Sequence, residues 1–121
     1  MSYSIHLRPG PACPTCGQYA PQPECCPDPT YNLARIFDLA LRGDRVVEAP
    51  TDLHILDGRT ARETIAEITA AIERLNDPLW RERFIALESP NGWGDLRGAQ
   101  IVMDQLLKLA LKYPHNIWEI E

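Results

Sequence analysis

The sequence lacks any block of clustered basic residues. Its 121 residues carry 12 Lys and Arg against 17 Asp and Glu, which gives a formal net charge of −5. Sequence-independent binding to nucleic acid needs clustered positive charge that neutralises phosphates. We therefore do not expect nucleic acid as a partner, although folding could still assemble a locally basic groove.

Long apolar runs are also absent. No stretch approaches the roughly 20 apolar residues that a membrane-spanning helix requires, and residues 1–10 lack the basic start and apolar core of a signal peptide. We therefore expect no membrane association and a cytoplasmic location. The composition, 45% apolar and 24% charged, is that of an ordinary globular protein, and the length predicts a single domain, residues 1–121.

Recognisable catalytic motifs are missing as well. The sequence contains no Walker loop, no Rossmann glycine pattern, no His-Glu-x-x-His and no Gly-x-Ser-x-Gly. It also lacks the His-x-Glu that a zinc deaminase requires. Glu63 and Glu67 lie one turn apart on the polar face of a predicted helix, where solvation explains them. The sequence therefore leans toward a protein that is not an enzyme.

All four cysteines fall within residues 9–29, which also hold seven of the eleven prolines. Such a segment buries too little apolar area to offset its ordering entropy, unless something else fixes it. Cys13 and Cys16 have the spacing that presents two thiolates to one ion, and Cys25 and Cys26 complete the four ligands of tetrahedral zinc. Because a reducing cytoplasm disfavours disulfides, we expect a Cys-rich structural zinc knuckle here.

Alternatives to this four-cysteine site remain open. The side chains of adjacent cysteines tend to point apart, so His6, His54 or His115 could replace Cys25 or Cys26 in the ligand shell. A disulfide, redox chemistry or unbound thiols are further interpretations. A closed zinc site would stabilise folding by about 10 kcal/mol, by analogy with zinc-finger peptides, and would supply no catalysis.

The apolar pattern predicts an α+β fold with three to four helices packed on a small antiparallel sheet. Alternation at residues 3–7 and 116–121 predicts two strands that pair and join the termini. Residues 30–121 should form the helical core and the C-terminal strand. Residues 44–56 hold two short apolar pieces, Val46-Val47 and Leu53 to Leu56, one of which we expect to be a third strand.

Capping residues set the expected helix limits. A first helix should begin at Thr30 or Asn32 and end at Arg42 before Gly43. A second, residues 60–76, starts with the capping box formed by Thr60 and Glu63. A short third helix should have Pro78 at its first position. The longest helix should follow the cap Asp95 and end at Tyr113 before Pro114.

Two polar and aromatic clusters occur at predicted helix starts: Tyr31 and Asn32 in one, and Asn91, Trp93 and Asp95 in the other. Free amide groups at a helix start favour an anion, and an aromatic ring could stack on a planar ligand. The alternative is that Tyr31 and Trp93 fill the core while the neighbouring glycines satisfy turn geometry.

The motifs at Cys13 to Cys16, Thr30 to Asn32 and Asn91 to Asp95 resemble those of small uncharacterised proteins of actinobacteria and their phages. The resemblance touches most of the chain, whereas the Cys25-Cys26 pair is not part of that pattern. It implies a phage-encoded protein and transfers no catalytic residue, because the group has no assigned activity.

These observations favour a small non-enzymatic zinc-binding protein that acts through protein-protein interaction, phage-encoded and directed at a host protein. The alternative is a small-ligand or nucleotide-binding, sequestering protein that uses Tyr31 and Trp93 at the two helix starts.

Overall fold

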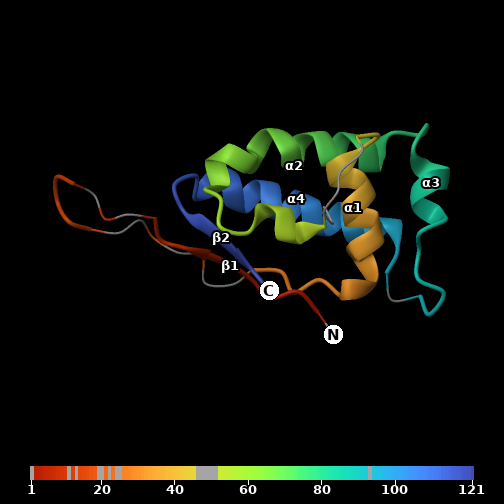
Figure 1. Ribbon diagram of the computed structural model, residues 1–121, viewed down its shortest axis with the longest axis horizontal. Coiled ribbons are helices and arrows are strands. Elements are labelled where there is room, and N and C mark those ends of the chain that lie inside the picture. Colours follow the sequence, from red (N-terminus) through yellow and green to blue (C-terminus); the bar gives the residue numbers. More distant parts are fainter. Residues whose placement is uncertain are drawn as a thin grey trace.

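The computed structural model describes residues 2–10, 12, 14–18, 21, 23, 26–45, 52–92 and 94–121. These residues form an α+β fold in which helices pack on a small sheet (Figure 1). The elements are strands β1 (Ile5–Arg8) and β2 (Ile117–Ile120), helices α1 (Ala34–Arg42), α2 (Ala61–Asn76), α3 (Arg81–Ile85) and α4 (Leu96–Lys112), and 3-10 helices η1 (Tyr31–Leu33) and η2 (Leu53–Leu56). None of the helices in these ranges is long and apolar enough to cross a membrane.

The two strands join the ends of the chain, as the sequence predicts. β1 and β2 are antiparallel, with Ile5 opposite Ile120 and Leu7 opposite Trp118. All four of these side chains are buried, because alternation places them on the face that meets the helices. Ser4 and Glu121 exchange two further backbone hydrogen bonds, at 3.0 and 2.9 Å. The sheet therefore holds both ends of the chain against the helices.

The main helix pair is α2 with α4. Both helices bury alanines completely, Ala71 in α2 and Ala99 in α4, and small side chains let helices approach closely. The indole nitrogen of Trp118 donates to the hydroxyl of the buried Thr64 at 2.9 Å. This hydrogen bond connects the sheet to α2 through the core.

The start of α2 differs from the prediction. The helix begins after Thr60 as expected, but the Thr60 hydroxyl forms no capping hydrogen bond. Thr60 instead pairs with Ile117 in an isolated β-bridge, and the Ala61 amide donates to the Asn116 carbonyl at 2.8 Å. The predicted capping box is wrong because the turn before β2 already supplies acceptors for the first amides of α2.

The third strand predicted within residues 44–56 is not found at 53–56, which form η2. The Asp52 carboxylate accepts a hydrogen bond from the His54 amide at 3.0 Å and so caps a helical turn. Leu53 and Leu56, three residues apart, are both fully buried. Strand alternation would have put them on opposite faces. The other apolar piece, Val46-Val47, lies outside the described residues.

Two helix limits are as expected and one is not. Asp95 caps α4 by accepting from the Gly98 amide at 2.8 Å, and Gly43 follows the last residue of α1. The helix predicted to begin at Pro78 instead begins at Arg81. The Asp77 carboxylate accepts from the Leu79 amide at 2.9 Å, and this hydrogen bond holds the intervening residues in a turn.

Candidate functional site

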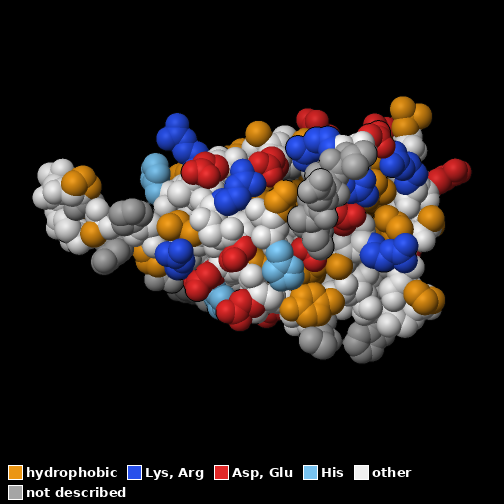
Figure 2. Space-filling model, in the orientation of Figure 1, with side chains coloured by type: hydrophobic (Ala, Val, Ile, Leu, Met, Phe, Trp, Pro, Cys, Tyr) orange, Lys and Arg blue, Asp and Glu red, His pale blue; other side chains and the backbone are white. Residues whose placement is uncertain are grey.

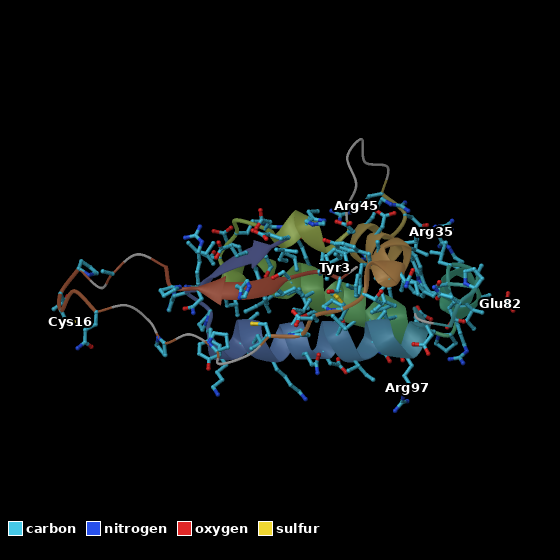
Figure 3. All side chains as sticks on the ribbon, turned by 90° about the horizontal axis from the view of Figure 1, so that it is seen from below. Tyr3, Cys16, Arg35, Arg45, Glu82 and Arg97 are labelled. Atoms are coloured by element: carbon cyan, nitrogen blue, oxygen red, sulfur yellow. The ribbon has the colours of Figure 1, made fainter. Side chains whose placement is uncertain are left out.

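We call the cysteine-containing segment, residues 9–29, the arm. Its described residues 14–18 lie away from the helices (Figure 1). Cys16 is exposed at its far end (Figure 3), whereas Cys26 packs against the hydrophobic core. The structure does not bring these two cysteines together, and Cys13 and Cys25 lie outside the described residues. Within the described ranges no group of three or more His, Cys, Asp or Glu could hold a metal ion. The zinc knuckle stays a prediction.

The root of the arm is held by Asn116, whose side chain is fully buried. Its amide nitrogen donates to the Leu7 carbonyl at 3.4 Å and to the Pro21 carbonyl at 2.9 Å. Gly10 lies so close to the His115 backbone that an added Cβ would be 2.5 Å from its carbonyl oxygen. The arm is therefore fixed to the turn between α4 and β2.

The structure places the two helix-start clusters in contact. A Cβ added to Gly94 would lie 2.6 Å from the Asn32 carbonyl oxygen, so only glycine allows this approach. Asn91 is exposed and accepts a hydrogen bond from the Ser89 hydroxyl at 2.6 Å. Trp93 lies outside the described residues. The contact between the clusters is long-range, and neither motif alone predicts it.

Two carboxylates accept hydrogen bonds from backbone amides at the start of α4. The Leu96 amide donates to the Glu88 carboxylate at 2.9 Å, and the Gly98 amide donates to the Asp95 carboxylate at 2.8 Å. Both groups complement the positive end of the helix dipole. An anionic ligand at this helix start would have to displace or approach two negative charges.

Tyr31 contacts a polar cluster that the sequence does not reveal. Its ring meets the Tyr3 ring edge-on, with centroids 4.5 Å apart. The buried Tyr3 hydroxyl donates to Asp52 Oδ2 at 3.1 Å, and Asp52 Oδ1 lies 2.9 Å from His54 Nδ1. Burial raises the pKa of the Tyr3 hydroxyl, and the Asp52 charge adds to the effect. These contacts attach the start of the chain to η2.

The arrangement of His54 and Asp52 could orient an imidazole for proton transfer, since the carboxylate fixes one ring nitrogen. However, among the described side chains no hydroxyl or thiol group is hydrogen-bonded to His54 that could act as its nucleophile. The Ser4 hydroxyl lies 3.2 Å from His6 Nε2 instead, on an exposed part of the chain. The described side chains around His54 and His6 therefore assemble no nucleophilic site.

A groove between α1 and α3 gathers arginines. It has a volume of about 450 Å³ and is lined, among the described residues, by Arg35, Asp38, Leu39, Arg42, Arg83 and Leu87. Figure 2 shows basic side chains grouped over α1 and α3. Arg35 and Arg42 are two helical turns apart, a signal that the sequence offers, but Arg83 comes from another element.

The function of this chain has to be inferred from its own sequence and structure. Comparisons with protein-family models, curated proteins and solved structures found no match. Three regions are therefore candidates: the arm, the two helix-start clusters, and the arginine groove.

Proposed function

We propose that this chain is a small non-enzymatic zinc-binding protein that acts through protein-protein interaction, with the arm as the contacting element. The observation that supports this proposal is the exposure of residues 14–18 at the far end of the arm (Figure 3). A segment held away from the core contributes little to its packing, whereas it is available to a partner. The resemblance to phage proteins favours a bacterial host protein as that partner.

Zinc would be held by Cys13, Cys16, Cys25 and Cys26, or by three of them with a histidine. In a reducing cytoplasm thiols are available to metal rather than paired. Zinc-sulfur bonds are about 2.3 Å long, so ligands of one ion must lie close together. Because Cys16 and Cys26 lie apart, a site that uses both requires the arm to bend back toward α4.

The metal is tested by elemental analysis of the full chain purified without added zinc. We expect one zinc per chain, and its loss in Cys16→Ser. Ser2→Ala is a matched control because Ser2 lies outside the arm. A wild-type chain without metal, or zinc retained in Cys16→Ser, would count against the zinc site proposed at Cys16.

The interaction is tested by pull-down from an actinobacterial lysate. We expect the intact chain to capture a protein that is lost when residues 14–18 are replaced by glycine and serine. Equal capture by both chains would place the contact elsewhere on the molecule. Recovery of no protein, together with tight binding of a small molecule, would overturn the interaction function.

A small-ligand or nucleotide-binding function at Tyr31 and Trp93 is the second candidate. The close approach of Gly94 to Asn32 favours it, because it sets the two helix starts side by side. Glu88 and Asp95 weigh against a phosphate at the start of α4. If this candidate is right, Trp93→Ala abolishes nucleotide binding without lowering the melting temperature, whereas a core role for Trp93 lowers that temperature.

A further inference from the structure

We propose that the groove between α1 and α3 binds small organic phosphates, with Arg35, Arg42 and Arg83 contacting the phosphate and Leu39 and Leu87 contacting the organic group. The site shares no residue with the arm or with the helix-start clusters. The phosphate site can therefore be tested independently of zinc binding and of the protein-protein interaction proposed above.

Arginines outnumber carboxylates among the described lining residues of the groove. Its described lining holds three guanidinium groups and one carboxylate, Asp38, in a chain whose net charge is −5. Asp38 accepts a hydrogen bond from Arg42 Nη2 at 3.3 Å. Arg35 is exposed and forms no hydrogen bond or ion pair with the part of the chain that the structure describes. A dianion entering the groove would therefore meet an available guanidinium group.

The other ion pair at the groove, between Arg83 and Asp44, can be broken at little cost when a ligand binds. Arg83 Nη2 lies 3.0 Å from Asp44 Oδ1, but the side chain of Asp44 is 75% exposed. Ion pairs this exposed contribute little to stability because water screens them. Arg83 could therefore give up Asp44 for a phosphate at small cost.

Two of the three arginines are held in place without a ligand. The guanidinium of Arg83 lies over the Trp80 ring, 4.3 Å from its centroid, in a cation-π contact. Arg42 Nη1 donates to the Gly43 and Arg45 carbonyls at 3.3 and 3.4 Å. Side chains that are already ordered lose less entropy on binding. The groove is thus partly organised for an anion.

The size and lining of the groove indicate the ligand class. A volume of about 450 Å³ falls within the range of roughly 300–1,000 Å³ typical of small-molecule sites. Guanidinium groups match the paired oxygens of phosphate, and the buried Leu39 offers an apolar floor beside them. Nucleic acid would need a longer basic track, so a small phosphate ester fits the site better than a polymer.

The test is calorimetric titration of the full chain with phenyl phosphate and, separately, with inorganic phosphate. We expect phenyl phosphate to bind more tightly, because its ring can contact the leucines. We expect Arg35→Gln to weaken phenyl phosphate binding roughly tenfold, which corresponds to about 1.4 kcal/mol, without changing the melting temperature. Arg97→Gln is the matched control, since Arg97 is an exposed arginine on α4 on another side of the molecule (Figure 3).

Arg42→Lys keeps the charge but loses the forked donor geometry, so it should also weaken phenyl phosphate binding. Absence of phenyl phosphate binding, or equal affinity in Arg35→Gln and wild type, would overturn the proposal. Equal affinity for phenyl phosphate and inorganic phosphate would overturn the assignment of an organic ligand. Tighter binding of a single-stranded oligonucleotide, lost in Arg35→Gln, would assign the groove to nucleic acid instead.

Discussion

Tyr3 buries an ionisable hydroxyl beside a carboxylate. Burial raises its pKa, and the Asp52 charge adds to the rise, so the folded chain keeps this proton where the unfolded chain, with an ordinary tyrosine pKa of about 10, loses it. The stability from the protonated hydroxyl is complete below about pH 10 and is lost as pH rises from there toward the raised pKa of the folded state.

We therefore predict that the free energy of unfolding falls above about pH 10, and that Tyr3→Phe makes this fall shallower. At pH 7 the same variant should lose about 1 kcal/mol with the hydrogen bond to Asp52. Urea unfolding at both pH values measures the two effects. Tyr113→Phe is the control: it measures how much the pH dependence of the free energy of unfolding changes when a tyrosine outside this cluster is replaced. An unaltered slope in Tyr3→Phe would show that another group controls alkaline unfolding.

Glu67 forms a paired contact with Arg59. The two guanidinium nitrogens donate to its carboxylate oxygens at 2.9 and 2.6 Å, and this hydrogen bonding lowers the pKa of Glu67. The stability gained from the pair is present above the unfolded glutamate pKa of about 4.3 and is lost as pH falls through the lowered pKa. The expectation of a solvated face fits Glu63, which is exposed, better than Glu67, which is half-buried.

Glu67→Gln should lower the free energy of unfolding by up to about 1 kcal/mol at pH 7, since the pair is partly exposed. The difference from wild type should close in acid, where both chains lack the ion pair. Urea titrations at pH 7 and at a series of lower pH values test this, with Glu63→Gln on the same helix as control. A difference that stays constant as pH falls would mean that Glu67 acts through packing rather than charge.

At the scale of elements, Gly94 determines how closely the start of α4 approaches η1. A Cβ there would lie 2.6 and 2.8 Å from the carbonyl oxygen and carbon of Asn32, and backbone atoms cannot move aside cheaply. We predict that Gly94→Ala lowers the free energy of unfolding by about 1–3 kcal/mol, the usual cost of overpacking. Chemical denaturation measures it.

Gly98→Ala provides the contrast within the same helix start. The nearest atom to its added Cβ is the Asp95 side-chain oxygen at 3.0 Å, which can rotate, and alanine is favoured over glycine in a helix by roughly 1 kcal/mol. Because rotation of that oxygen would weaken its capping hydrogen bond from the Gly98 amide, the two effects oppose each other, and Gly98→Ala should change stability less than Gly94→Ala does. Equal losses in the two variants would show that the Asn32 contact is not what Gly94 provides.

The elements were predictable where the signal is local. Alternation predicted strands β1 and β2, and Asp95 and Pro114 predicted the limits of α4. The errors arise where a distant partner decides, as for Thr60, whose neighbour Ala61 donates to the Asn116 carbonyl. Leu53 and Leu56 fit either a strand or a helical turn until the Asp52 cap is seen.

In the candidate sites, too, local features were predictable from the sequence and long-range contacts were not. The sequence placed Tyr31 and Asp95 at helix starts, but not the contact of Gly94 with Asn32, which links segments about 60 residues apart. The arginine groove was missed because α1 supplies Arg35 and Arg42 while α3 supplies Arg83. Charge counted along the chain hides such a groove, since the acidic residues elsewhere outnumber its arginines.

At the scale of the whole molecule, the described part of the arm meets the helical body at its base, where Asn116 donates to the Pro21 carbonyl, Gly10 approaches His115 and Cys26 packs against the core. The body has its own core, to which Trp118, Phe37 and Met103 contribute, whereas residues 14–18 are exposed. Losses of structure in the arm and in the body should therefore be separable. Asn116 connects them through its hydrogen bonds to Leu7 and Pro21.

If the arm holds zinc, removing the metal should disorder the arm and leave the body folded, because the body core does not depend on residues 14–18. We predict that a strong chelator raises amide hydrogen exchange at residues 14–18 while the melting temperature of the body changes little. Asn116→Ala should instead lower the free energy of unfolding by about 2 kcal/mol, since it removes the donor to the Leu7 carbonyl inside the molecule and the hydrogen bond to Pro21. If chelation instead destabilises the body as much as Asn116→Ala does, the metal organises the core. Cys26, which packs against that core, would then have to be a metal ligand.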